Sequence, residues 1–298
     1  GPRDPQRAIR ALTVRALECS GAPRDLGRDL GGALRAELRA AFRAERSLRG
    51  RLAAFRRTNA EVQLHSDLRR YFPHHAEWLE GLALGSGVSL RALVGALAAI
   101  SAPEAPQGVA VGAVSGASVG IANAVPRGAV LRRVAPQGRF RSVEFALPAA
   151  TAPAIGVNEA GLAVAVAEQR SLPGRFAPPI ALFARDCLER FERVEPALDW
   201  CLARPAAPGG SLLLADARGE IAGVYASGPE RRALRPLSWL VLGDASLEVT
   251  KAEPLAAGVL EPALADALAS LPGAGLAVIA DPAGRRLRSA GGEWISFA

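Results

Sequence analysis

Residues 107–123 read QGVAVGAVSGASVGIAN, and the character of the chain changes at this stretch. Its two apolar runs, VAVGAV and ASVGIAN, are divided by glycine, as is typical of short antiparallel strands. Further runs of the same kind follow at residues 141–147, 152–157 and 161–167. The sequence therefore predicts strands from residue 108 onward.

The first third of the chain has helical periodicity instead. Apolar residues recur every four positions through residues 23–45, a spacing that predicts one amphipathic helix; they are Leu26, Leu30, Leu34, Leu38 and Phe42. Three more helices are expected at residues 60–72, 74–85 and 90–100, the last with Ser89 as its N-cap. Residues 1–107 are thus predicted to be helical.

Helices and strands alternate again after residue 178. Two helices are expected at residues 179–191 and 195–204, with a break at Pro196, and a hairpin turn is expected at Ala217–Gly219 within residues 210–227. A strand at 237–243, a helix at 260–271 and strands at 275–281 and 285–292 close the chain. Since proline and glycine are scattered without a linker, we expect one α+β domain over residues 1–298, with two sheets covered by helices in residues 108–298.

Composition excludes several classes of protein. The 298 residues are 50% hydrophobic, enough for a substantial core, and the net charge is +7. Arginines and carboxylates interleave through residues 35–46, as on a solvated helix face, so no nucleic-acid partner is expected. Three cysteines form neither a disulfide framework nor a metal-finger spacing. With no apolar run long enough to span a membrane and no signal-peptide pattern, we expect a cytoplasmic protein without a membrane partner.

Six segments, in order, resemble one family. They are LECSGAPRDLGRDLGGALRAEL (17–38), FPHHAEWLEGLALGSGVSLRALVGA (72–96), IGVNEAGLAVAV (155–166), FARDCLER (183–190), LLLADARGEIAGVY (212–225) and VIADPAGRRLRSAGG (278–292). Together they are similar to the acyl-coenzyme A:isopenicillin N acyltransferase family of N-terminal nucleophile hydrolases, which is peptidase C45-like. The resemblance covers nearly the whole chain and implies a four-layer αββα sandwich.

Active members of that family cleave themselves in front of a cysteine. Their chemistry needs the freed thiol, the new α-amino group as base, and donors that stabilise the oxyanion. In this chain the Gly-Cys junction falls near Gly108–Val109, and valine offers no nucleophile. The resemblance therefore implies a protein that keeps the fold of the family but has a degenerate catalytic centre.

Other catalytic positions depart from the family as well. Its Gly-Arg-Asn-x-Asp strand corresponds to GIANAV, in which Asn123 is kept without the arginine or the aspartate. The glutamate after the hairpin is replaced near Tyr225, and a Thr-Asn-His segment has become LGDAS around Asp244. The resemblance thus places Gly108, Val109, Asn123, Asn158, Tyr225 and Asp244 around the former substrate cleft.

The remaining chemically reactive residues have plainer interpretations. Cys187 and Cys201 occupy apolar helical positions and are expected to pack as small hydrophobes. Cys19 precedes the first helix, where a thiol pKa can fall, but an inert residue is favoured. Ser115 and Ser118 lie in the strand region and could replace the missing cysteine, although neither follows the expected glycine junction.

Two further motifs point to structure. His74 and His75 follow Pro73 beside Glu77, but no third ligand is spaced to complete a metal site, so a surface or capping role is expected, with no metal and no cofactor. Asn158 with Gly161 is expected to form a turn that tolerates left-handed backbone geometry.

The sequence therefore favours a non-catalytic member of this fold, a pseudoenzyme that binds a small molecule, an acyl chain, a peptide or a partner protein. The alternative is a divergent amide hydrolase or N-acyltransferase that uses Ser115, Ser118 or a repositioned thiol. A structural subunit that pairs with an active paralogue is a variant of the first hypothesis.

Overall fold

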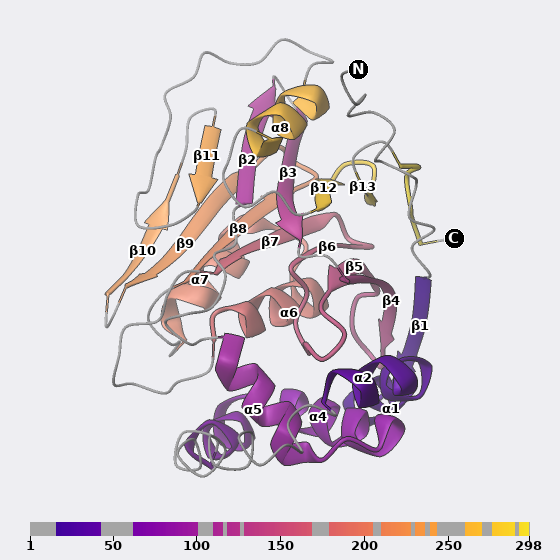
Figure 1. The fold of residues 1–298 in the computed structure, drawn as a ribbon. Coiled ribbons are helices and arrows are strands. Elements are labelled where there is room, and N and C mark those ends of the chain that lie inside the picture. Colours follow the sequence, from indigo (N-terminus) through magenta and orange to yellow (C-terminus); the bar gives the residue numbers. More distant parts are fainter. Residues whose placement is uncertain are drawn as a thin grey trace, which may run out of the picture.

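Two β-sheets lie face to face with helices on both outer sides in the computed structural model of the chain. From top to bottom, Figure 1 shows α8, the smaller sheet, the larger sheet and the remaining helices. The structure describes residues 16–42, 62–100, 110–115, 118–125, 128–168, 179–204, 210–227, 230–235, 239–242, 260–269, 276–289 and 292–297. This order of layers is the expected αββα sandwich.

The larger sheet has the strand order β1-β4-β5-β6-β7-β8-β9-β10. Its strands are β1 (Ala16–Gly21), β4 (Val130–Pro136), β5 (Ser142–Ala146), β6 (Ile155–Asn158), β7 (Leu162–Glu168), β8 (Gly210–Asp216), β9 (Ile221–Ser227) and β10 (Glu230–Leu234). All neighbouring pairs are antiparallel except β1 and β4, which are parallel. The predicted turn joins β8 to β9, where Gly219 has φ 91° and its N–H donates to Asp216 O at 3.1 Å.

The smaller sheet is antiparallel throughout, in the order β11-β2-β3-β12-β13. Its strands are β2 (Ala110–Ser115), β3 (Ser118–Val125), β11 (Trp239–Leu242), β12 (Leu276–Asp281) and β13 (Arg286–Ser289). Within residues 107–123, the described residues 110–115 and 118–123 therefore belong to β2 and β3, which pair as a β-hairpin inside this sheet.

The helices are α1 (Pro23–Ala33), α2 (Arg35–Ala41), α4 (Pro73–Ser86), α5 (Leu90–Ile100), α6 (Ala181–Arg190), α7 (Val194–Ala203) and α8 (Leu260–Ala269). Residues 62–71 are also helical. The single helix expected over residues 23–45 is interrupted at Leu34, which leaves two helices. None of the helices among the described residues has the length and apolarity needed to cross a bilayer.

Three expectations about element boundaries were wrong. Pro196 lies inside the first turn of α7, where its missing N–H has no helical partner to lose, and the chain instead breaks at 191–193. The helical first third also contributes β1, which joins the edge of the larger sheet through β4. Neither β4 nor β10 was predicted, because arginines interrupt the apolar alternation of both strands.

The period of two along each strand divides the core into three layers. One face of the larger sheet packs against α1, α4, α6 and α7 through residues such as Val164 and Leu214. Its other face meets β2 and β3 through residues such as Ala165 and Leu213. The outer face of the smaller sheet packs against α8.

Glycines set the distance between α1 and α4. A Cβ atom built on Gly27 would lie 2.0 Å from Trp78 O, and one built on Gly81 would lie 1.9 Å from Arg24 O. Gly31 and Gly85 follow one turn later on the two helices, where a Cβ atom would lie 2.6 Å from Leu82 O and 2.3 Å from Arg28 O. The two helices therefore cross backbone against backbone, and this crossing positions α4, which carries His74, His75 and Trp78.

Candidate functional site

The start of β2 is where the family resemblance places the nucleophile. Gly108 and Val109 lie outside the described residues, but the next residue, Ala110, is paired in register with Asn123 on β3. Asn123 is 2% exposed, and its Nδ2 donates to Ala154 O at 2.7 Å and to Val166 O at 2.9 Å. Asn123 therefore ties the smaller sheet to the larger one beside the start of β2.

Two polar atoms near the hydrogen bonds of Asn123 have unused hydrogen-bonding capacity. Within the described part of the chain, Asn123 Oδ1 and Ser211 Oγ are buried and have no hydrogen-bond partner. Ser211 lies between Ala167 and Tyr225 in the register of β7, β8 and β9, so the three side chains share the face of the sheet that meets β2 and β3. The structure thus brings Asn123 and the half-buried Tyr225 to one intersheet region, together with Ser211, which the sequence analysis did not consider.

The fallback serines lie at the other end of β2. Ser115 is paired with Ser118 where the hairpin turns, about 17 Å along the strand from Ala110. Ser115 is buried and Ser118 is exposed. Neither hydroxyl is therefore near the head of the strand. Asp244, the last of the predicted cleft residues, lies outside the described residues.

All three thiols of the chain lie on the opposite side of the larger sheet. Cys19, Cys187 and Cys201 belong to the core between that sheet and the helices, with exposures of 2%, 0% and 0%. Burial raises the pKa of Cys19 to about 11, despite the opposing charge of Arg132. Burial also raises the pKa of Cys187, which lies 3.5 Å from the sulfur of Cys201. The expected packing role of these thiols is confirmed.

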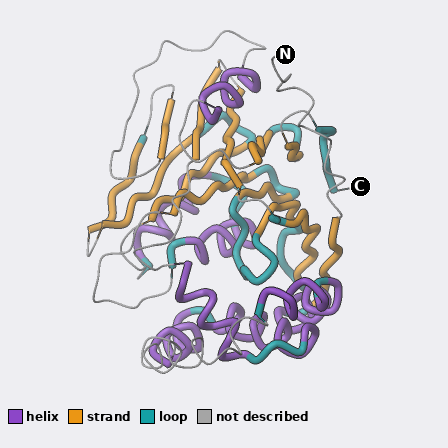
Figure 2. The backbone as a smooth tube through the Cα atoms, in the orientation of Figure 1, coloured by secondary structure: helices purple, strands orange, loops and turns teal. Residues whose placement is uncertain are grey.

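A loop of residues 147–154, teal in Figure 2, links β5 to β6 and is held by buried side chains. Arg132 Nη1 donates to Ala150 O at 2.7 Å, and Arg185 Nε donates to Thr151 O at 3.2 Å. Buried carbonyl groups need donors, and in an irregular loop the side chains must supply them. Because Asn123 binds Ala154 O, the same loop is attached to both layers of the sandwich.

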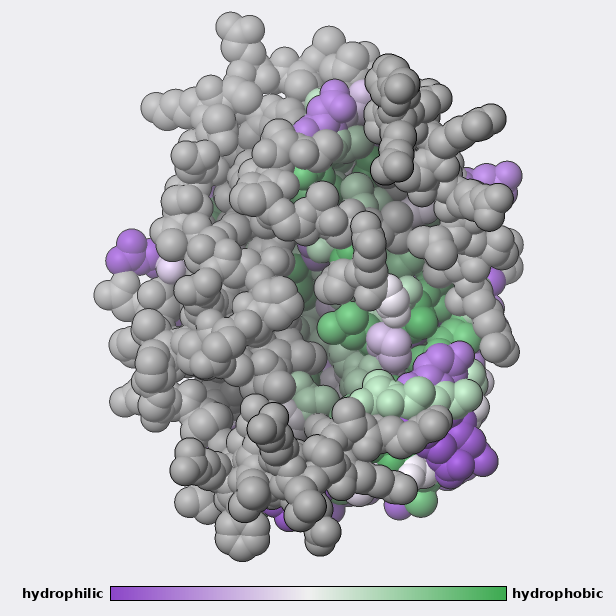
Figure 3. Space-filling view, in the orientation of Figure 1, coloured by the Kyte–Doolittle hydropathy of each residue, from purple (hydrophilic) through white to green (hydrophobic). Residues whose placement is uncertain are grey.

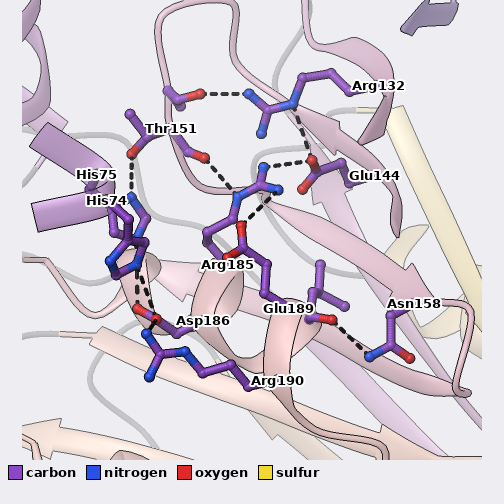
Figure 4. Close-up of polar contacts among 12 residues, drawn as sticks. His74, His75, Arg132, Glu144, Thr151, Asn158, Arg185, Asp186, Glu189 and Arg190 are labelled. Carbon is purple, nitrogen blue, oxygen red and sulfur yellow. Dashed lines mark hydrogen bonds and ion pairs between the residues drawn. The ribbon is translucent and has the colours of Figure 1, made fainter. Parts of the chain in front are cut away.

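The two arginines belong to a buried ionic network, drawn in Figure 4. Arg185 Nη2 donates to Glu144 Oε1 at 2.6 Å, and Arg132 Nε lies 3.5 Å from the same oxygen. The Arg185 and Arg132 guanidinium carbons lie 4.5 and 5.6 Å from the centre of the Trp78 ring. The two buried cations are thus balanced by Glu144, by the Trp78 ring and by Glu189, whose Oε1 lies 3.8 Å from Arg185 Nη1.

The sequence contained a signal for this network. Arg132 and Glu144 stand at positions of β4 and β5 whose strand neighbours Leu131 and Val143 face the intersheet core, so the two charges must point toward the helices. A charge at a core-facing strand position requires a buried partner. Which partner it finds depends on the packing of α6 against the sheet.

Asn158 does not join the intersheet region. It is fully buried, and its Nδ2 donates to Leu188 O at 2.9 Å and to Phe191 O at 2.7 Å, while its Oδ1 accepts from Leu162 N at 2.8 Å. Gly161 has φ 96°, so the predicted left-handed turn is present. Asn158 therefore fastens the β6–β7 turn to the end of α6.

The predicted surface or capping role of the two histidines was wrong for the buried His75, whereas the side chain of His74 is 21% exposed. His75 is 1% exposed, and both imidazoles face Asp186 of α6, which is fully buried (Figure 4). Asp186 is 111 positions after His75, so local spacing in the sequence gave no sign of a third ligand. Burial lowers the pKa of His75 to about 4, against the opposing effect of Asp186, so its ring is neutral at pH 7. Burial alone would raise the pKa of Asp186, but the two imidazoles hold it well below its usual range.

No protein-family model matches the chain, and no match is found among the curated proteins. Solved structures do show similarity. A Caenorhabditis elegans orthologue of N-acylethanolamine-hydrolyzing acid amidase has a TM-score of 0.46 and 11% identity, over 59% of this chain and 93% of that one. Penicillin V acylase from Agrobacterium tumefaciens has a TM-score of 0.31 and 22% identity, over 43% of this chain and 49% of that one.

A mutant of the conjugated bile acid hydrolase from Clostridium perfringens has a TM-score of 0.31 and 13% identity, over 47% of this chain and 54% of that one. The chain thus spans about half the length of the latter two proteins. Its own layers, two facing sheets with helices on both outer sides, are those of the αββα sandwich of N-terminal nucleophile hydrolases.

Proposed function

We propose that this protein is a non-catalytic, cytoplasmic relative of the isopenicillin N acyltransferase-like hydrolases that binds an apolar ligand carrying an N–H or O–H group. The binding region is the intersheet region at the head of β2, formed by Asn123, Ser211 and Tyr225, together with loop 147–154. The observation that carries the proposal is the location of the nucleophiles. Every thiol of the chain lies behind the larger sheet, away from this region.

The histidine side chains, like the thiols, lie away from this region. The three histidines of the chain are His65, in the helical residues 62–71, and His74 and His75 at the start of α4. The helices that carry them pack on the side of the larger sheet away from β2. With Asn123 aligned to the family pattern, the arginine and aspartate positions are Ala122 and Val125. A hydroxyl at the head of β2 would therefore lack the family's charged partners and, unless the chain is cleaved there, the α-amino base; no imidazole is placed to replace that base.

The region retains features that suit a ligand. Asn123 Oδ1 can accept a hydrogen bond and Ser211 Oγ can accept or donate one, and leaving such groups unpaired costs about 1–3 kcal/mol each. The neighbouring loop reads LPAATAPA and contains only one polar side chain, Thr151. Figure 3 shows apolar residues at the surface of the described part, between the strands and the N-terminal helices. This combination of apolar residues and unpaired polar atoms favours a ligand with an acyl chain joined to an amide or hydroxyl group.

Intact mass spectrometry separates this proposal from an active, self-processing enzyme. We expect one uncut chain of 30.9 kDa after prolonged incubation. Two fragments divided near residues 108–118 would contradict the proposal and support the serine-dependent alternative. Prolonged incubation with an N-acylethanolamine, used only as an amide probe, should release no amine.

Binding is tested with the same probe by isothermal titration calorimetry. Ser211→Ala serves as the diagnostic variant, because removing an unpaired buried hydroxyl should leave stability unchanged or slightly raised. If Ser211 Oγ contacts the ligand, this variant weakens binding about 5–10-fold. Ser118→Ala, at the far end of the hairpin, is the control. Equal affinities of the two variants would contradict the placement of the ligand, and absent binding of acyl amides of any chain length would contradict the ligand class.

A further inference from the structure

Four ligand-type atoms converge between α4 and α6, outside the intersheet region. His74 Nε2 lies 3.1 Å from Asp186 Oδ1, and His75 Nε2 lies 3.6 Å from Asp186 Oδ2. One ligand atom from each of the three side chains lies within 4.8 Å of the other two. Figure 4 shows both imidazoles directed at the carboxylate, one from each of two consecutive residues.

These atoms have no hydrogen-bond partner of acceptable geometry among the described residues. The unsatisfied atoms are both Nε2 nitrogens and both Asp186 oxygens. The 3.6 Å separation exceeds hydrogen-bond range, and the contacts of Asp186 Oδ1 with His74 Nε2 at 3.1 Å and Arg190 Nη2 at 2.9 Å are ion-pair contacts without hydrogen-bond geometry. Buried polar atoms are almost always hydrogen-bonded, so four unsatisfied atoms at one place call for an explanation.

The spacing fits a transition-metal shell. Zn²⁺ is bound tetrahedrally by imidazole nitrogen and carboxylate oxygen at about 2.0–2.1 Å, which places neighbouring ligand atoms about 3.3 Å apart. The two measured separations, 3.1 and 3.6 Å, lie on either side of that value. Two histidines and one carboxylate also form a ligand set that leaves a fourth position for water.

A second layer of contacts orients the ligands. His75 Nδ1 lies 3.0 Å from Thr151 Oγ1, and Thr151 is fully buried. When Nδ1–H donates to this hydroxyl, the Nε2 lone pair is directed toward Asp186, as in metal sites whose histidines donate their other N–H to a neighbouring group. Since Thr151 belongs to loop 147–154, that loop would also support the metal site.

We propose that His74 Nε2, His75 Nε2 and the Asp186 carboxylate bind one Zn²⁺-type transition-metal ion between α4 and α6. The ion enters from the side of His74, whose side chain is 21% exposed. Arg190 Nη2 lies 2.9 Å from Asp186 Oδ1 and is 29% exposed, so it is the cation that the metal displaces toward solvent. The ion then ties α4 to α6 beneath loop 147–154.

The test uses the full chain without an affinity tag, stripped of metal with a chelator and returned to buffer at pH 7.5. Zn²⁺ affinity is measured by competition with a chromophoric chelator, and Co²⁺ gives an independent visible spectrum. We expect one equivalent of each ion and the intense absorption of tetrahedral Co²⁺. His75→Ala and Asp186→Asn should each weaken binding more than about 100-fold, and Thr151→Val about 10–100-fold.

Two variants give the controls. His65→Ala removes the remaining histidine and should leave affinity unchanged. Arg190→Gln removes the competing cation and should tighten Zn²⁺ binding several-fold, a result that a purely structural role of the cluster would not produce. Far-UV circular dichroism confirms the fold of each variant, and His74→Ala, at a partly exposed position, replaces His75→Ala if the latter does not fold.

The absence of stoichiometric Zn²⁺ binding to the wild-type chain would overturn the proposal. So would binding that His74→Ala leaves unchanged, or a Co²⁺ spectrum without tetrahedral character. Apart from Thr151→Val, which alters loop 147–154, none of these variants changes the proposed ligand-binding region, so the metal proposal and the proposed function can fail separately.

Discussion

Replacing Gly81 by alanine should disrupt the crossing of α1 and α4. The new Cβ would lie 1.9 Å from Arg24 O, whereas an ordinary contact begins at 3.4 Å, so the helices must separate locally by about 1.5 Å. The obstructing atom is backbone and has no alternative rotamer. Relief must therefore come from movement of the helices themselves.

The expected change in the free energy of unfolding is the balance between the cost of overpacking and lost contacts and the gain in helix propensity. Overpacking costs about 1–3 kcal/mol, and a gap wider than 1 Å removes more than about half of the dispersion energy of the contacts across the crossing. Alanine recovers about 1 kcal/mol of helix propensity relative to glycine. We therefore expect Gly81→Ala to lower the free energy of unfolding by about 3–5 kcal/mol.

Gly32 on α1 is the matched control. A Cβ atom there meets nothing within 4 Å, so Gly32→Ala should stabilise the chain by up to about 1 kcal/mol. Urea denaturation followed by far-UV circular dichroism measures both variants against the wild type. If the two variants have the same free energy of unfolding within about 0.5 kcal/mol, the backbone crossing does not set the packing of α4.

Three further outcomes are expected. Glu144→Gln should lower the free energy of unfolding by about 3–5 kcal/mol, because it leaves the buried Arg132 without a carboxylate and Arg185 with only Glu189, 3.8 Å away. Glu159→Gln, in an exposed ion pair, should change it by less than about 1 kcal/mol, and equal effects would contradict the burial argument. Asn123→Leu should lower the free energy of unfolding by about 2–4 kcal/mol, because Ala154 O and Val166 O lose the donor that they share. An unchanged midpoint of urea denaturation would show that these two hydrogen bonds are dispensable. The three thiols should resist a thiol-specific reagent at pH 8 and react fully in denaturant. The pKa of Cys19 is raised in the folded chain to about 11. Its contribution to the free energy of unfolding is therefore complete below pH 9 and declines by about 1.4 kcal/mol per pH unit as the pH rises toward 11. Cys19→Ala should remove this decline.

The sequence predicted most helices and strands because their apolar residues follow the periods of those elements. The spacing of Leu26, Leu30 and Leu38 correctly identified the buried face of the first helices. Periodicity did not predict β4, whose Arg132 and Arg133 interrupt the apolar pattern. The buried charge of Arg132 is stabilised by contacts from other elements, namely Glu144 on the neighbouring strand, Ala150 O and the Trp78 ring.

The intersheet region and the histidine–aspartate cluster also differ in how far the sequence alone could identify their residues. Asn123 could be singled out from the sequence because the motif around it resembles a known strand, although the carbonyls that it binds could not. Asp186 could not be singled out, since α6 contains alternating charged and apolar residues with no local sign of a ligand. Its relation to His74 and His75 arises only when α4 and α6 pack on the same face of the larger sheet.

The amino-acid sequence by itself determined the α+β class, the absence of cysteine from residues 107–123, and the glycines that α1 and α4 carry. These are local properties, fixed by side-chain period, residue type and the missing Cβ. Only the tertiary structure decided that the thiols lie behind the larger sheet and that two histidines meet an aspartate 111 positions away. Such contacts depend on which faces of distant elements are buried against each other, and short-range sequence patterns do not encode that choice.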